Sequence, residues 1–447
     1  MDIDDISGGS VGYFWASHSK RINFRRRSES GYLKVNPTGQ VEVQTLEESP
    51  FDSFGSADSP GIPKSIFAST PAGGALVVDI FRQTSNIRWG GAKASTHSFF
   101  AHALIMGVDD NAQDPRFSYF STFVPGIQDW AGVRTIDEER KNDDAQRIQS
   151  VSLQVRSGAP QEVRLNASTK FELSWHWQVS GSADNRSIYA PVSLAVRSMR
   201  PKSYRELLSP LHRIQDLVCL ALDGFVAADG GRAHLILDPD PRTSPTLWDG
   251  RLMAAPPGTT TPKSMTEIPL FSLGDLGGVD ALRRWIKIYE SHPRAVRPFV
   301  SRYRLGATSP EVQLMEVAAG MEYWVASHRR TTSWAKNKRI PLAIAERVGS
   351  PFGDWIGDLE KWDTAFWETY NAIKHEANYK PDRYMVSVMA QSGSLLLTAA
   401  ILNRVAGNKG VSKRIFRSHR TRALGEEASG YVANFSPNPG RKKKKGR

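Results

Sequence analysis

Residues 370–375 read YNAIKH, within a run of regularly spaced apolar residues from 355 to 405. The apolar spacing predicts helices, and on a helix Asn371, Lys374 and His375 share one face because they are spaced i, i+3 and i+4. A carboxamide, a cation and an imidazole on one face can bind a phosphate and transfer a proton. The same trio can also be a solvated helix face, and the spacing alone leaves both interpretations open.

This run belongs to a helix-rich C-terminal half that follows a β-rich N-terminal half. Residues 11–200 contain short apolar runs, such as 75–80 and 98–106, that are separated by Gly, Pro, Asn and Ser and alternate in part. We therefore expect an α+β protein in which an antiparallel β-sandwich or barrel-like domain precedes an all-α helical bundle. Helical spacing predicts helices over residues 203–225, 277–290, 309–328, 338–348, 353–378 and 383–406.

The change of pattern predicts four segments. Residues 1–200 form a β-rich domain, 201–306 a helical connector with a long loop, 307–406 the helical bundle, and 407–447 a disordered basic tail. The long loop, residues 238–265, is rich in Pro, Thr and Ser. A lid, a partner-contact segment and simple disorder are all open interpretations of that loop.

The composition limits the classes of function. With 40% apolar and 23% charged residues, the 447-residue chain can bury a large core. No run approaches the roughly 18 apolar residues of a membrane span, and the acidic start does not resemble a signal peptide, so we expect a cytoplasmic protein without membrane contact. The single cysteine, Cys219, excludes an internal disulfide and a cysteine zinc site, and its apolar neighbours predict a buried structural thiol. Residues 375–379, HEANY, lack the second histidine of a two-His zinc helix, so we expect no metal and no cofactor.

The net charge of +12 is concentrated in the tail, where residues 407–447 contain 12 Lys/Arg and 2 Glu. Such a tail attracts polyanions without sequence preference, or it only keeps the chain in solution. A second basic cluster follows a predicted helix, where it can contact phosphate or offset the helix dipole. The candidate nucleic-acid-binding residues are therefore Arg329, Arg330, Lys442, Lys443, Lys444 and Lys445.

Residues 367–375, WETYNAIKH, resemble the signature of HEPN domains, the helical bundles of many RNA-cleaving toxins. That signature consists of Arg, a polar residue, three variable residues and His, so Asn371 and His375 fall on the polar and His positions. The N-terminal half resembles the N-terminal domain of ApeA-like phage-defence proteins, through an early GYFW at 12–15, successive short strands and the aromatic passage at 117–130. Together the two resemblances cover roughly residues 10–406.

The resemblance implies a phage-defence RNase of the abortive-infection type that cleaves RNA, with tRNA as the suggested substrate, by attack of the ribose 2′-hydroxyl and without a metal. It implies His375 as the acid/base, Asn371 as the residue that positions phosphate or ribose, a homodimer formed through the bundle, and a phage-derived trigger. Where HEPN nucleases have Arg, this chain has Tyr370, which supplies no permanent forked charge. Lys374, one turn further on, would stabilise charge with help from Tyr370.

Two further interpretations remain open. The bundle can be a catalytically inactive module for binding or dimerisation, with a β-rich domain that senses a ligand or phage product. Alternatively, the chain associates with nucleic acid through its basic tail alone.

Overall fold

The structure is a computed structural model of the whole chain. It describes residues 6, 8–16, 29–47, 62–86, 95–108, 116–144, 146–182, 184–235, 245–259, 261–262, 268–306, 308–329, 339–376, 378–380 and 382–436.

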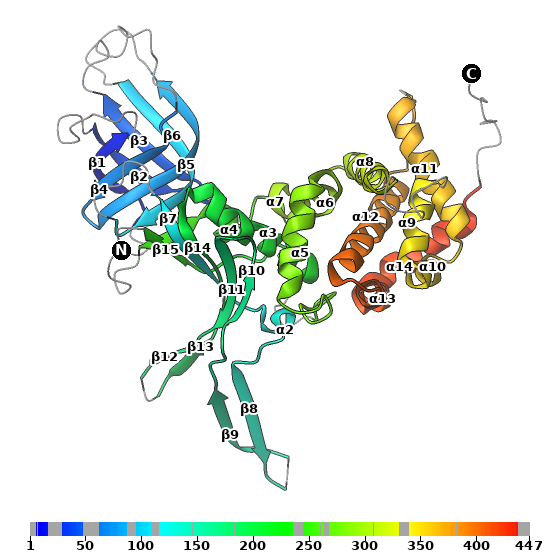
Figure 1. Cartoon of the computed structure of the whole chain (residues 1–447), viewed down its shortest axis with the longest axis horizontal. Coiled ribbons are helices and arrows are strands. Elements are labelled where there is room, and N and C mark those ends of the chain that lie inside the picture. The colour runs from blue at the N-terminus through cyan, green and yellow to red at the C-terminus, as the bar shows by residue number, and fades with distance from the viewer. Residues whose placement is uncertain are drawn as a thin grey trace.

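Six antiparallel strands near the N-terminus close into a barrel (Figure 1). The barrel order is β6-β3-β2-β1-β4-β5, and β5 pairs back onto β6, so the barrel has no free edge. Phe14, Leu33 and Val77 are among the apolar side chains that fill its interior. The strands are β1 (Ser10–Ala16), β2 (Glu29–Val35), β3 (Val41–Glu47), β4 (Ser65–Thr70), β5 (Gly73–Asn86) and β6 (Ser95–Met106).

Strand β6 belongs to two cores because its side chains alternate between the faces of the sheet. Leu104 and Met106 lie in the barrel core, whereas Ala103 and Ile105 belong to a larger core outside the barrel. Beyond β6 the same antiparallel sheet continues in the order β16-β15-β7-β14-β11-β10. These strands are β16 (Thr246–Asp249), β15 (Gly231–Leu235), β7 (Phe117–Val124), β14 (Val192–Lys202), β11 (Thr169–Trp175) and β10 (Gln161–Arg164).

The sheet does not end at residue 200, where the sequence predicted the end of the β-rich domain. Helix α3 (Tyr204–Leu222) packs on β14 and β7, and the chain then returns to the sheet as β15 and β16. Part of the predicted 238–265 loop is therefore ordered, as β16 and the short helix α4 (Gly250–Met253). Pairing with β6 explains this difference, because that contact is distant in sequence and leaves no local signal.

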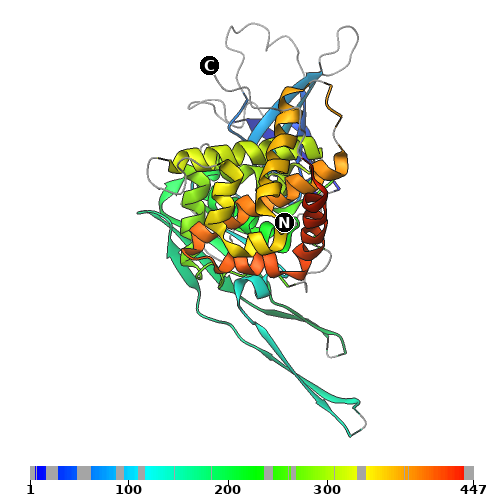
Figure 2. The ribbon, with the colours of Figure 1, turned by 90° about the vertical axis from the view of Figure 1, so that its right-hand side faces the viewer.

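Two β-hairpins project away from the extended sheet (Figures 1 and 2). One is formed by β8 (Ile136–Asn142) and β9 (Ile148–Val155), the other by β12 (Gln178–Gly181) and β13 (Arg186–Tyr189). Most of their side chains are exposed, including the apolar Ile148, Val151 and Leu153. The hairpins therefore add little to the core.

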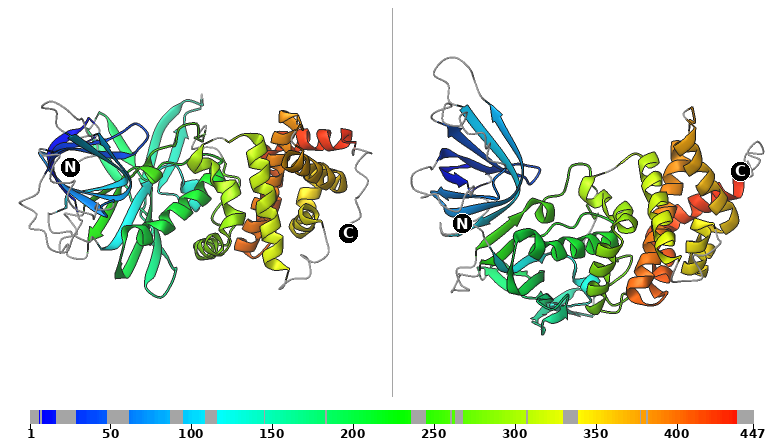
Figure 3. Two further views of the ribbon diagram at one scale, coloured as in Figure 1. Left: turned by 90° about the horizontal axis from the view of Figure 1, so that it is seen from above. Right: turned by 45° about the horizontal axis from the view of Figure 1, so that its top comes forward.

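The C-terminal part of the chain is all helical and lies on the far side of the extended sheet from the barrel (Figure 3). Helix α12 is central and packs against α8, α9, α13 and α14. It is long and apolar enough to cross a membrane, yet 83% of its apolar window is buried inside the fold, as expected for a core helix. The helices are α5 (Asp280–Ser291), α6 (Pro293–Val300), α7 (Arg302–Leu305), α8 (Pro310–His328), α9 (Ile340–Val348), α10 (Ser350–Ile356), α11 (Leu359–His375), α12 (Arg383–Ala406), α13 (Gly410–Arg417) and α14 (His419–Asn434).

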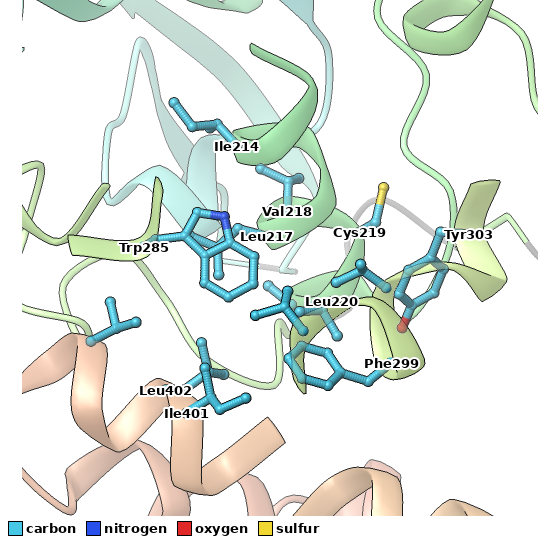
Figure 4. Packing of buried hydrophobic residues seen from close by; sticks show 14 of the residues in the cluster. Ile214, Leu217, Val218, Cys219, Leu220, Trp285, Phe299, Tyr303, Ile401 and Leu402 are labelled. Atoms are coloured by element: carbon cyan, nitrogen blue, oxygen red, sulfur yellow. The ribbon is translucent and has the colours of Figure 1, made fainter. Parts of the chain in front are cut away.

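One continuous core joins the extended sheet to the helices. Figure 4 shows Leu217 and Leu220 of α3 beside Trp285 and Phe299, with Ile401 of α12 on the other side. All five side chains are almost completely buried. The predicted α+β class, with an antiparallel barrel-like domain followed by helices, is confirmed.

Residues 410–434, predicted to belong to a disordered tail, instead form α13 and α14. Val411, Ile415 and Val432 are buried against the bundle, so this segment buries enough apolar surface to be ordered. The composition of the tail as a whole, which its basic end dominates, concealed these apolar positions. The lysines at 442–445 lie outside the described residues.

Candidate active site on helix α11

Helix α11 begins at a capped N-terminus and presents its C-terminal turn to solvent. The Asp358 carboxylate accepts a hydrogen bond from the Lys361 backbone N–H at 3.0 Å, which satisfies an otherwise unpaired donor of the first turn. The apolar face, with Trp362 and Phe366, is buried against the bundle. Burial of that face leaves the last turn, including His375, exposed.

A close approach to α12 fixes the position of α11. Gly393 of α12 lies against Phe366, and a β-carbon at Gly393 would come within 2.5 Å of that ring. The Trp362 indole N–H donates to the Ser392 hydroxyl at 3.1 Å. These contacts hold α11 firmly, so its C-terminal turn has a defined position.

Tyr370 and Lys374 form the main contact of the predicted site. The Lys374 ammonium donates to the Tyr370 hydroxyl oxygen at 3.0 Å and lies 5.1 Å from the centre of the Tyr370 ring. The hydrogen bond that Lys374 donates to Tyr370 raises the pKa of Lys374, and the amine is charged at neutral pH, as a lysine ordinarily is. The Tyr370 side chain is only 3% exposed and packs against Trp367 at a ring-centre distance of 5.0 Å. A buried tyrosine thus anchors a cation beside the position that the motif gives to arginine.

The other two predicted residues lie on the same turn. Asn371 is half-buried, and His375 is exposed next to Lys374. The turn therefore presents an amide, a cation and an imidazole to solvent, as the sequence spacing predicted. Among the residues that the structure describes, no group of three His, Cys, Asp or Glu side chains could hold a metal ion.

Arg329 lies at the opposite end of the bundle from His375. Helix α8 runs parallel to α12, because Val317 lies against Gly393 and Gly320 against Leu397. Helix α11 runs antiparallel to α12, so His375 lies beyond the N-terminal end of α12, which is about 36 Å long at 1.5 Å per residue. The structure therefore does not bring Arg329 to the α11 site, and Arg330 lies outside the described residues.

A protein-family model described as ApeA N-terminal domain 1 matches residues 9–285, more than half of the chain. The chain belongs to the ApeA family. Its membership supports a general role in phage defence. No curated protein and no solved structure matches the chain.

The family match of this ApeA protein covers the barrel, the extended sheet and α3, and it ends within α5. The predicted resemblance of the N-terminal half to ApeA proteins is therefore confirmed. The helices that follow are compatible with a HEPN domain, although the match does not reach them.

Beneath the barrel, the ApeA chain buries a network of polar side chains. The Asp249 carboxylate, completely buried, accepts hydrogen bonds from Tyr204, from His212 Nε2 at 3.4 Å and from Arg251 at 3.0 Å. Burial alone raises the pKa of Asp249, but His212 and Arg251 outweigh it and hold the pKa far below its ordinary value. Arg251 also forms a 2.8 Å ion pair with Asp79 of β5. The network ties the barrel to α3 and α4, so we assign it a structural role.

The sequence did not reveal a cavity at one end of the helical bundle that is lined by basic residues, among them Arg404. Its lining residues come from four helices and the loop after α12. Arg347 and Arg404 lie in the last turns of their helices, where cations commonly offset the dipole, and the other basic residues lie in separate segments of the chain. No local pattern could therefore have identified the cluster.

Proposed function

We propose that this ApeA protein is a phage-defence RNase of the abortive-infection type, which cleaves RNA at the C-terminal turn of α11. His375 acts as acid and base, Asn371 positions the phosphate or ribose, and Lys374 stabilises charge. Tyr370 positions Lys374. The observation that carries the proposal is the hydrogen bond between Lys374 and the buried Tyr370, which supplies a cation where the HEPN arginine is missing.

The chemistry needs three functions, and the turn offers a residue for each. Attack of a ribose 2′-hydroxyl requires a base at that oxygen, an acid at the leaving 5′-oxygen, and stabilisation of the charged phosphorane. An imidazole can take either proton-transfer role near neutral pH. One copy of the turn provides one imidazole, so we propose a homodimer in which two α11 helices face each other and contribute two. The reaction then requires no metal and no cofactor.

The partners follow from the charge distribution and the family. RNA, with tRNA as the first candidate, is attracted by Arg329, Arg330 and the basic end at 442–445, because phosphate charge dominates such association. A phage-derived trigger is sensed by the β-rich half, and the protein acts in the cytoplasm.

The test compares three purified proteins on total cellular RNA in the presence of EDTA, with mapping of the cleaved ends. We expect wild type to cut and leave 2′,3′-cyclic phosphates, and His375→Ala to lose all cutting while keeping its melting temperature. The matched control is His419→Ala, which removes an equally exposed histidine from α14 and should cut like wild type. Equal cleavage by His375→Ala and wild type would show that the site is wrong. Cleavage that EDTA abolishes would contradict the metal-independent mechanism.

The second candidate is a binding-only bundle, and the burial of Tyr370 favours it. A buried phenol whose oxygen accepts from Lys374 is poorly placed to replace a forked arginine on a phosphate. Two substitutions at this position separate the candidates. If the natural site is active, Tyr370→Phe should lower cleavage, because Lys374 loses its anchor. If the natural site is degenerate, Tyr370→Phe should change nothing, and Tyr370→Arg should produce cleavage that wild type lacks.

A further inference from the structure

A cavity of about 930 Å³ lies at the end of the bundle away from His375. The C-terminal ends of α5, α8, α9 and α12 converge on it, together with the loop into α13. Among the described residues that line it there is no acidic side chain. The basic side chains in its lining are Arg284, Lys287, Arg347, Arg404 and Lys409.

The charge of these five residues exceeds what the helix ends require. Only Arg347 and Arg404 lie in the last turn of a helix, where a cation offsets the helix dipole, whereas Arg284, Lys287 and Lys409 do not. None of the five forms an ion pair within the described residues. Arg284 donates instead to the backbone carbonyls of Leu276, at 3.1 Å, and Val405. A surplus of positive charge therefore faces the cavity.

An aromatic wall completes the cavity. The rings of His292 and His328 stack with centres 5.7 Å apart and an interplanar angle of 26°, and Trp324 lies 4.3 Å from His328. The His328 Nδ1–H donates to the Trp324 carbonyl oxygen at 2.7 Å, which fixes that ring. His292 Nδ1 is buried and has no hydrogen-bond partner among the described residues. A buried nitrogen of this kind is costly unless a ligand or water supplies its partner.

The surroundings of His292 are positive as well as buried. Burial lowers the pKa of His292, and His328 and Arg404 lower it further by repulsion. An anionic ligand would neutralise the cations of the rim and would favour the protonated form of His292.

We propose that this cavity binds a small organic polyphosphate of the nucleoside triphosphate class. The cations contact the phosphates, and the stacked histidines provide a flat surface for the base. The volume lies in the range of small-molecule sites, and a concave cavity holds a compact ligand better than an extended RNA strand. The site is distinct from the α11 turn, because none of the described residues that line the cavity belongs to α11.

The experiment measures binding of ATP and of inorganic tripolyphosphate to the full chain by titration calorimetry in EDTA at moderate salt. We expect wild type to bind both, with ATP tighter because of its base. Arg404→Gln and Arg347→Gln should each weaken ATP binding by about tenfold, as expected for loss of one charged hydrogen bond. The matched control is Arg283→Gln, which removes the same charge from an exposed position of α5 outside the cavity, and should bind like wild type.

Three outcomes would overturn the proposal. Wild type could bind neither ligand at millimolar concentration. Arg404→Gln and Arg347→Gln could both bind as tightly as Arg283→Gln. A short RNA could bind in a manner that depends on Arg404 while ATP and tripolyphosphate do not, which would make the cavity an RNA groove. His375→Ala should retain ATP binding, so failure of this proposal is distinguishable from failure of the proposed RNase.

Discussion

Replacing Asp249 should destabilise the junction between the barrel and α3 more than any change on the surface. Its carboxylate is completely buried and accepts hydrogen bonds from Tyr204, His212 and Arg251, and from the backbone N–H groups of Arg251 at 2.8 Å and Leu252 at 3.2 Å. Removing one partner of a buried ion pair typically costs about 3–5 kcal/mol, because the other charge stays buried without compensation. Loss of the α4 cap is worth about 1 kcal/mol, but the two effects share the same oxygen and do not simply add.

Two substitutions separate these contributions. Asp249→Ala removes both the charge and the cap, whereas Asp249→Asn keeps a good capping side chain and removes only the charge. We expect both to lower the melting temperature by about 3–5 °C, measured by differential scanning fluorimetry, with Asp249→Asn slightly less affected. The control is Asp354→Ala, an exposed carboxylate of α10, which should shift melting by less than about one degree. If both Asp249 variants melt like this control, the network contributes no net stability and the reasoning fails.

Two further predictions concern titration and thiol reactivity. Burial lowers the pKa of His212 and of His102, so each binds its proton less readily in the folded state than in the unfolded state. The neutral forms of these two histidines therefore stabilise the fold fully above about pH 6.5, and this contribution is lost as the pH falls below that value. The melting temperature of the protein should drop between pH 7 and pH 5. A His212→Gln variant whose melting temperature drops just as steeply would contradict this. Burial raises the pKa of Cys219 to about 12, and its side chain has no exposed surface. Mass spectrometry should therefore find the Cys219 thiol unmodified by iodoacetamide in the native protein and fully modified in urea. Rapid modification of the native protein would refute the buried position.

The sequence predicted the parts of the fold that have a strong local signal. Alternating apolar runs identified β5, β6 and β7, and helical spacing identified α3, α8 and α12. It missed β16, a strand of four residues in a Pro-rich stretch, because only its pairing with β6 makes it a strand. It also merged α10 and α11 into one helix, although Gly357 separates them with a φ of 79°, which few residues other than glycine adopt.

The candidate site divides in the same way. The spacing of Asn371, Lys374 and His375 predicted their common face, because that relation depends only on helix geometry. The burial of Tyr370 depends on how α11 packs in the bundle, which no local pattern contains. The basic cavity is harder still, because Arg284, Arg347 and Arg404 come from three helices far apart in sequence, and each has an ordinary local explanation.

Because Tyr370 stands where HEPN domains have arginine, the positive charge at the proposed site would come from the ammonium group of Lys374 and not from a guanidinium group. Lys374 supplies a positive charge, but an ammonium is a point charge, whereas arginine offers two parallel donors to a phosphate. A site built on Lys374 would stabilise the phosphorane without fixing its orientation, so orientation would have to come from Asn371 or from a second copy of the turn. Under the proposed function, catalysis at this site would therefore depend on dimerisation more strongly than in a HEPN domain that retains its arginine. Cleavage per chain should then fall steeply on dilution below the dimer dissociation constant, and a rate per chain that is independent of concentration across that range would refute the two-copy site.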